Sequence, residues 1–139
     1  MSYISAFDPS EDKKRNLASK ILYISESVIK FFWDDAPRLG IQQREGQQDM
    51  AFDVLDAIKS GSHVVIEAGV GIGKSFAYLV PILLYNAKTF SPVVIATSTI
   101  ALQEQLLSDV ERLKKWLRIE PDLILAKGKN HYLCLRRAS

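Results

Sequence analysis

Hydrophobic residues recur at helical spacing in three stretches of the chain. In residues 10–33, apolar positions three or four apart are separated by Lys and Glu, and residues 43–60 repeat the pattern and end before Gly61, a residue typical of helix ends. A third helix is predicted from residue 99 to 117. The predicted buried faces are Leu17, Ile21, Ile24, Val28 and Phe32; Met50, Val54, Ala57 and Ile58; and Leu102, Leu106, Val110, Leu113 and Leu117.

Three other segments, residues 63–66, 92–97 and 122–126, are apolar throughout and have the length of strands. A helix is predicted from Ser75 to about Ala87, and Pro81, which lacks a backbone N–H, should kink it or start a new helix. Continuous apolar strands separated by helices are typical of a parallel sheet that is covered on both faces. The pattern therefore predicts an α/β fold with a doubly wound parallel sheet.

Composition adds limits to this prediction. The chain has 139 residues, of which 47% are hydrophobic and 24% charged, as expected for about one soluble globular domain. Its net charge of +2 does not by itself favour nucleic acid. The single cysteine, Cys134, excludes an internal disulfide, and no apolar run is long enough to span a bilayer. We expect a cytoplasmic protein without membrane contact.

The segment Ala-Gly-Val-Gly-Ile-Gly-Lys-Ser, residues 68–75, lies between a predicted strand and a predicted helix. Its glycines permit a tight turn whose N–H groups face an anion, and the helix N-terminus adds a positive dipole end. This pattern indicates a nucleotide-binding P-loop, in which Lys74 reaches phosphate oxygens and Ser75 helps to hold Mg²⁺. The predicted nucleotide ligands are Ala68, Gly69, Val70, Gly71, Ile72, Gly73, Lys74 and Ser75.

The alternative for this segment is a glycine-rich turn that is followed by a lysine by chance. It is disfavoured because strand, turn, Lys-Ser and helix occur in the right order. The first position of the general P-loop pattern is glycine, and here it is Ala68, which is small enough for the turn to survive.

Several amide and guanidinium side chains precede the apolar positions of the helix predicted over residues 43–60. Among them are Arg44 and Gln47, which lie near three further glutamines in the sequence. These residues form either a solvated polar turn or a base-recognition site. In the second case the Gln47 carboxamide, which donates and accepts at once, pairs with the edge of adenine, and Arg44 orients the loop.

Two further polar clusters follow the later predicted strands. Thr97, Ser98 and Thr99 either cap the next helix or hold phosphates of a second ligand such as a nucleic-acid backbone. Lys127 and Lys129, with an aromatic ring nearby, form either a solvated loop or a surface for single-stranded nucleic acid.

Four segments, residues 44–50, 67–81, 95–106 and 127–134, together carry a resemblance. In this order they resemble the amino-terminal part of the DinG/XPD group of superfamily 2 ATP-dependent DNA helicases. The resemblance implies an incomplete RecA-like P-loop NTPase domain over residues 39–139, which ends at the start of an iron–sulfur insertion. A helical N-terminal extension, residues 1–38, precedes it.

The resemblance also implies roles for residues. Gln47 becomes the adenine-sensing glutamine, Lys74 and Ser75 the catalytic residues of ATP hydrolysis with Mg²⁺, and residues 97–103, including Gln103, the segment that tracks the phosphates of DNA. Cys134 matches the first of four cysteines that ligate a 4Fe–4S cluster in many members. Val70 and Ile72 depart from the family, which commonly has Thr at both positions.

The implied function is that of an ATP-dependent DNA helicase acting on single-stranded or branched DNA. The Asp-Glu-Ala-His box, the other cluster cysteines and the second motor domain are absent from this sequence. We therefore expect a truncated N-terminal fragment without its C-terminal helicase portion, which binds nucleotide weakly and is inactive alone. The alternatives are a non-catalytic nucleotide- or DNA-binding module and, less favoured because of the glutamine and Thr-Ser-Thr clusters, a small-molecule kinase.

Overall fold

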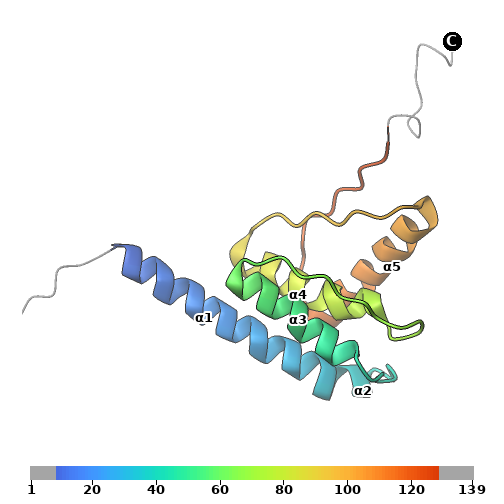
Figure 1. The fold of residues 1–139 in the computed structure, drawn as a ribbon, viewed down its shortest axis with the longest axis horizontal. Coiled ribbons are helices and arrows are strands. Elements are labelled where there is room, and N and C mark those ends of the chain that lie inside the picture. The colour runs from blue at the N-terminus through green and yellow to red at the C-terminus, as the bar shows by residue number, and fades with distance from the viewer. Residues whose placement is uncertain (1–8, 129–139) are drawn as a thin grey trace, which may run out of the picture.

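The structure is a computed structural model that describes residues 9–128. Its helical elements are α1 (Pro9–Lys30), the π-helix η1 (Phe31–Asp35), α2 (Ala36–Arg38), α3 (Gln47–Ser60), α4 (Lys74–Thr89) and α5 (Ile100–Leu117). Figure 1 shows α1 as a long rod whose first half extends beyond the other helices. The chain runs from this rod through α3 and α4 to α5, with extended loops between them.

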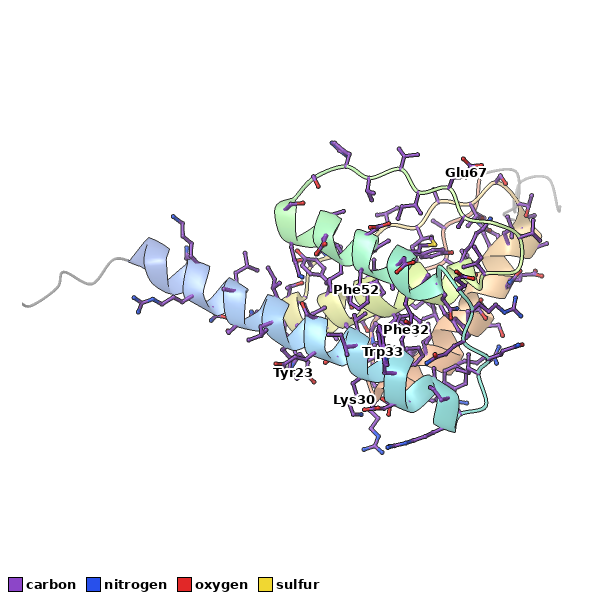
Figure 2. All side chains as sticks on the ribbon, turned by 60° about the horizontal axis from the view of Figure 1, so that its bottom comes forward. Tyr23, Lys30, Phe32, Trp33, Phe52 and Glu67 are labelled. Carbon is purple, nitrogen blue, oxygen red and sulfur yellow. The ribbon has the colours of Figure 1, made fainter. Side chains whose placement is uncertain are left out.

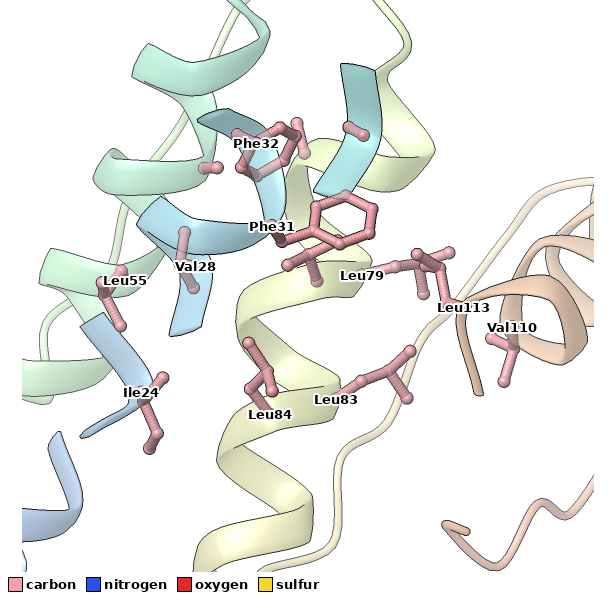
Figure 3. Close-up of a cluster of buried hydrophobic side chains, with 14 residues drawn as sticks. Ile24, Val28, Phe31, Phe32, Leu55, Leu79, Leu83, Leu84, Val110 and Leu113 are labelled. Carbon is pink, nitrogen blue, oxygen red and sulfur yellow. The ribbon is translucent and has the colours of Figure 1, made fainter. Parts of the chain in front are cut away.

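Helix α4 lies at the centre of the core, and α1, α3 and α5 all pack against it. Its buried residues come from more than one side of the helix, as expected because the stretch from Phe76 to Leu84 is apolar except for Tyr78. They are Ala77, Leu79, Val80, Pro81, Leu83 and Leu84. Figure 3 shows Leu79, Leu83 and Leu84 between side chains of the neighbouring helices. The helix continues through Pro81 as one element, so a new helix does not start there.

The end of α1 passes into a wider π turn that directs two consecutive rings into the core. Phe31 and Phe32 are each 1% exposed, and their centroids lie 5.2 Å apart in an edge-to-face arrangement. The side-chain amide of Gln43 donates to the carbonyl of Phe32, which gives this irregular turn an additional hydrogen bond. Trp33 lies nearby against Phe52 of α3, with centroids 6.0 Å apart (Figure 2).

Several predicted boundaries and faces are corrected by these elements. Helix α3 begins at Gln47 rather than at residue 43, because Gly46 just before it has a φ of +79°, outside the helical range. Leu17 was predicted to be buried and is 49% exposed, because it lines an open pocket with Tyr85 and Thr89 near the end of α4 and does not lie in the core. Leu102, in the first turn of α5, is likewise 45% exposed.

The predicted doubly wound parallel sheet is wrong: residues 9–128 contain no strand. The three apolar segments expected to be strands run as extended loops at residues 62–69, 90–97 and 119–128 (Figure 1). The backbone hydrogen bonds outside the helices close turns and helix ends, and within the described residues none joins two of these loops.

The three loops form no sheet because other parts of the protein leave them largely exposed to solvent. Their central residues face solvent, with Val65 99%, Val94 92% and Ile124 88% exposed, whereas a strand of a parallel sheet is buried on both faces. A cleft of about 990 Å³ separates residues 90–97 and 119–126 from α4 and α5. The helices bury their apolar faces against one another, and the loops are left without a packed layer on which to pair.

The division into an extension of residues 1–38 and a domain of residues 39–139 stays a prediction. Within the described residues, side chains from both sides of this boundary belong to one hydrophobic cluster, which holds Ile24, Phe31 and Phe32 of the first part and Leu55 and Leu79 of the second.

Truncation of Phe31 tests the position of the core. Phe31→Ala is expected to lower the free energy of unfolding by about 3–5 kcal/mol, because it removes a ring that is 1% exposed. Leu22→Ala, on the preceding helix α1 at a side chain that is 61% exposed, is the matched control and should change it by less than about 0.5 kcal/mol. Urea unfolding followed by circular dichroism measures both. Equal losses in the two variants would contradict the observed core.

Candidate nucleotide-binding site

The loop before α4 has the backbone that the glycine-rich segment requires. Gly71 and Gly73 have φ values of +86° and +77°, a region that side chains other than glycine rarely adopt. Gly73 is the N-cap of α4, and its carbonyl accepts hydrogen bonds from the N–H groups of Phe76 and Ala77 at 3.2 and 3.3 Å. Lys74 is the first residue of the helix and is exposed. The loop therefore ends at the N-terminus of α4, next to the exposed side chain of Lys74.

Gln47 contacts this loop directly. It is the first residue of α3, is only 4% exposed, and its amide Nε2 donates to the carbonyl of Gly73 at 3.0 Å. A β-carbon at position 73 would overlap this Nε2, so glycine is needed there for space as well as for φ. The contact fixes the carboxamide against the P-loop, 26 residues away in the sequence.

Two more contacts join the same two segments. A β-carbon at Gly71 would lie 3.3 Å from Nη1 of Arg44, so the guanidinium lies against the bare glycine backbone. The side chain of Ile72 would meet β-carbons at Gly46 and Gly69 at 3.7 and 3.5 Å. Ile72 thus fills the space between the segments, whereas Val70 is fully exposed. Residues 44–47 and 69–73 face each other along their length.

Ser75 faces the interior of the protein from the first turn of α4. Its hydroxyl lies near the carboxylate of Asp109 on α5 and the hydroxyl of Tyr78 on its own helix. Burial raises the pKa of Asp109, while the Arg112 guanidinium and the Ser75 hydroxyl act in the opposite direction. Burial also raises the pKa of Tyr78. The Ser75 hydroxyl therefore has two ionisable side chains near it.

The Thr97–Thr99 cluster lies at the start of α5. Thr99 is the N-cap of this helix, and its Oγ1 accepts from the N–H of Leu102 at 3.2 Å. Thr97 Oγ1 donates to the carbonyl of Thr99 at 3.1 Å, and Ser98 is exposed. In Figure 1 the loops that lead into α4 and α5 both run toward the same side of the molecule. The capping role of Thr99 is thus present, and phosphate binding by the cluster stays a prediction.

The structure does not place the other residues predicted to contact DNA on an open surface. Gln103 turns inward, where its Nε2 lies 3.5 Å from the carbonyl of Ala126 and its Oε1 is buried without a hydrogen-bond partner. Lys127 is half-buried and takes part in an interaction of its own. Lys129 and Cys134 lie outside the described residues. The described part of the chain therefore places only the Thr97–Thr99 cluster in an open position.

Among residues 9–128, no three His, Cys, Asp or Glu side chains group in a way that could hold a metal ion. In the same part of the chain, every helix is too short or too polar to cross a bilayer.

Sequence reasoning missed two members of the site. Tyr78 lies three residues after Ser75 on one helix, so helical spacing alone could have placed the two hydroxyls together. Asp109 comes from α5 and follows Ser75 by 34 residues in the sequence, so only the packing of α5 on α4 brings the two residues close together. Arg44 and Gln47 were singled out, but their contacts with the P-loop glycines follow from tertiary structure.

The arrangement suits an anionic ligand with a flat base. Backbone N–H groups at a helix N-terminus, an exposed lysine and a half-buried hydroxyl can hold phosphate oxygens and a cation. A carboxamide fixed 3.0 Å from the same loop can offer its remaining donor and acceptor to a heterocycle.

The chain is similar to one family of known proteins and to several of its relatives. Residues 46–134 match the DEAD/DEAH box helicase family. The chain is 41% identical over 119 residues to the ATP-dependent helicase DinG of Mycobacterium tuberculosis and 43% identical over 99 residues to the ATP-dependent DNA helicase YoaA of Escherichia coli. It is 38% identical over 97 residues to the 3'-5' exonuclease DinG of Bacillus subtilis.

These matches cover most of this chain and little of the relatives. They take in 82%, 70% and 69% of the chain, but 18%, 15% and 10% of the three relatives respectively. No solved structure matches the chain significantly.

Gly73→Ala tests the contact between Gln47 and the P-loop. A positive φ costs alanine about 1–2 kcal/mol, and at position 73 the added carbon must also displace the Gln47 amide. Gly40→Ala is the control, because Gly40 has a φ of +71° but nothing within 4 Å. Urea unfolding should show a larger loss of free energy for Gly73→Ala than for Gly40→Ala. Equal losses would contradict the close approach of Gln47.

The raised pKa of Asp109 predicts a pH dependence of stability. The folded chain binds this proton more tightly than the unfolded chain does, so stability contributed by Asp109 decreases as the pH rises from the usual value of 3.8 through the raised one. Asp109→Asn removes the titratable group and therefore this pH-dependent contribution to stability. Thermal melts between about pH 3 and pH 7 should show the variant gaining on the wild type as the pH rises. A pH-independent difference in Tm would contradict the shift.

Proposed function

Because the chain belongs to the DEAD/DEAH box helicase family, we propose that Arg44, Gln47 and residues 68–75 bind ATP with Mg²⁺ as part of an ATP-dependent DNA helicase of the DinG group. The observation that carries this proposal is the contact between residues 44–47 and the glycine-rich loop. Two segments that family resemblance assigns to base and phosphate recognition are thereby joined in one site.

Each part of the nucleotide would have its own ligands. The backbone N–H groups of residues 69–75 would surround the phosphates, and the Lys74 ammonium would contribute a charge-assisted hydrogen bond to their oxygens. Gln47 would pair with the adenine edge, and Arg44 would lie beside the phosphates, since its guanidinium already faces Gly71. The glycines and Ala68 would keep side chains out of this space.

The residues present fit a magnesium-bound triphosphate. Mg²⁺ is held by oxygen ligands and usually keeps several waters, so one hydroxyl from Ser75 together with phosphate oxygens is a suitable set. When bound, the cation supplies neutralisation of phosphate charge. Lys74 and Ser75 are accordingly the residues that we propose to serve ATP hydrolysis.

An iron–sulfur cluster does not fit this chain in the same way. A 4Fe–4S cluster is held by four thiolates, and the sequence contains one cysteine, Cys134. Cys134 could serve as a ligand only together with cysteines outside this sequence, and we assign no step to such a cluster.

The proposed second ligand is single-stranded or branched DNA. Thr97, Ser98 and Thr99 precede α5, where hydroxyls and helix N–H groups could contact phosphate oxygens without reading sequence. Gln103, Lys127 and Lys129 are the further predicted contacts. A DNA helicase of this kind would act in the cytoplasm of a bacterium. DNA-stimulated ATP hydrolysis would contradict the alternative of a non-catalytic binding module.

Replacement of Lys74 tests the proposed function. Lys74→Ala should weaken Mg-ATP binding roughly 10- to 100-fold, because a charge-assisted hydrogen bond contributes about 1.5–3 kcal/mol. Lys88→Ala on the same helix removes the same charge at a side chain that lies over the ring of Tyr23, and it should bind as the wild type does. Isothermal titration calorimetry measures all three proteins. Absence of binding by the wild type, or equal affinities in all three, would overturn the proposal.

A further inference from the structure

The first half of α1 and the C-terminal end of α4 enclose an open groove of about 340 Å³. Its walls are formed by side chains of α1, of the last turns of α4 and of the loop after α4. The lining residues are Lys13, Asn16, Leu17, Lys20, Tyr85, Thr89 and Ser91. Lys88 of α4 joins the two helices here, because its Nζ lies 3.7 Å from the ring centroid of Tyr23 on α1. The groove therefore lies between two helices that contact each other.

The groove is surrounded by positive charge. Residues 13–25 of α1 contain four cationic residues and no Asp or Glu, and α4 and residues 90–97 contain no Asp or Glu either. The four are Lys13, Lys14, Arg15 and Lys20. Within the described residues, neither Lys13 nor Lys20 forms an ion pair with a carboxylate. Since the net charge of the chain is only +2, this charge is a local feature of the groove.

Neutral hydrogen-bond donors lie on the same walls. Thr89 Oγ1 donates to the carbonyl of Tyr85 at 2.8 Å and accepts from the N–H of Ser91 at 3.2 Å, so this hydroxyl is already used. In the part of the chain that the structure describes, the side-chain amide of Asn16 and the hydroxyls of Tyr85 and Ser91 have no hydrogen-bond partner. These three groups can donate to the oxygens of a ligand.

The spacing of the two lysines suits a chain of phosphates. Lys13 and Lys20 are seven residues apart, which places them on one side of α1 at about 10 Å along its axis. Phosphates follow one another at about 3.4 Å along one strand of duplex DNA, so the two ammonium groups match phosphates about three nucleotides apart. A bilayer surface fits less well, because a helix that binds it inserts an apolar face, and Leu17 is the one aliphatic side chain among the described residues that line the groove.

We propose that this groove binds the sugar–phosphate backbone of a DNA strand, with Lys13 and Lys20 as the phosphate contacts and Asn16, Tyr85 and Ser91 as neutral donors. The groove lies at the C-terminal end of α4 and the P-loop at its N-terminal end, so about 24 Å of helix separates the two sites. The α1 wall also lies outside residues 46–134, which match the helicase family. The inference rests on the proposed function, because it takes DNA as the ligand.

The test is the salt dependence of DNA binding by the full chain. Fluorescence anisotropy of a labelled oligothymidylate gives the affinity at each salt concentration. Each phosphate contact contributes about 0.7 to the slope of log K against log salt for a single strand, so Lys13→Ala/Lys20→Ala should reduce the slope by about 1.4 and the affinity at about 0.1 M salt by at least about tenfold. Lys59→Ala/Lys115→Ala removes the same charge from exposed lysines of α3 and α5 and should change neither value.

Circular dichroism separates a lost contact from a lost fold. All three proteins should show the same thermal transition, because the four substituted side chains lie outside the hydrophobic core. Sedimentation with phosphatidylserine vesicles tests the same lysines against a membrane surface, and neither double variant should differ from the wild type there.

Several outcomes would overturn the inference. Equal slopes and affinities in the wild type and Lys13→Ala/Lys20→Ala would do so, as would equal losses in the two double variants. Unchanged DNA binding together with weaker sedimentation of Lys13→Ala/Lys20→Ala on the vesicles would assign the groove to a membrane surface instead. Absence of DNA binding by the wild type would be a different result, because it would contradict the DNA ligand of the proposed function and the inference with it.

Discussion

The burial of α4 is the constraint on which the described structure depends. Its side chains are buried from Ala77 to Leu84 with few interruptions, so the other long helices find their apolar partners on this one element. Because α1, α3 and α5 pack against α4, they fix the position of its N-terminus. The glycine-rich loop that ends at Gly73 is thereby attached to the most firmly packed part of the chain, and α3, which packs on α4, contacts the loop through Gln47.

The candidate site combines local and long-range requirements. Locally, Gly71 and Gly73 adopt positive φ values that direct the loop into the start of α4. At long range, Gln47 of α3 donates a hydrogen bond to the carbonyl of Gly73, and Asp109 of α5 lies near the hydroxyl of Ser75. The loop is therefore held by a polar group of α3 at the point where it enters α4. A site that is organised before its ligand arrives loses less conformational freedom when the ligand binds.

The extended loops have no such support. In each of them a central residue, Val65, Val94 or Ile124, is almost wholly exposed, while its neighbours are less so. This alternation is the one that strands show when one face is covered and the other is open. The apolar runs therefore have the side-chain pattern of a single covered face, without the hydrogen bonds of a ladder. A large cleft between two of these loops and the helices shows that even the covered face is loosely packed.

The sequence by itself determined the elements whose information is local. Apolar spacing located α1, α3 and α5 within a few residues, and Gly61 marked the end of α3. The order of small residues, Lys74 and Ser75 identified the P-loop, placed the start of α4 and led to the family that the comparisons confirm. Tertiary structure decided what depends on distant residues. Whether an apolar run such as 92–97 pairs as a strand depends on neighbours that its own pattern does not specify, which is why the predicted sheet failed. The approach of Asp109 to Ser75 and of Gln47 to Gly73 was likewise decided by helix packing, because neither pair is close in sequence.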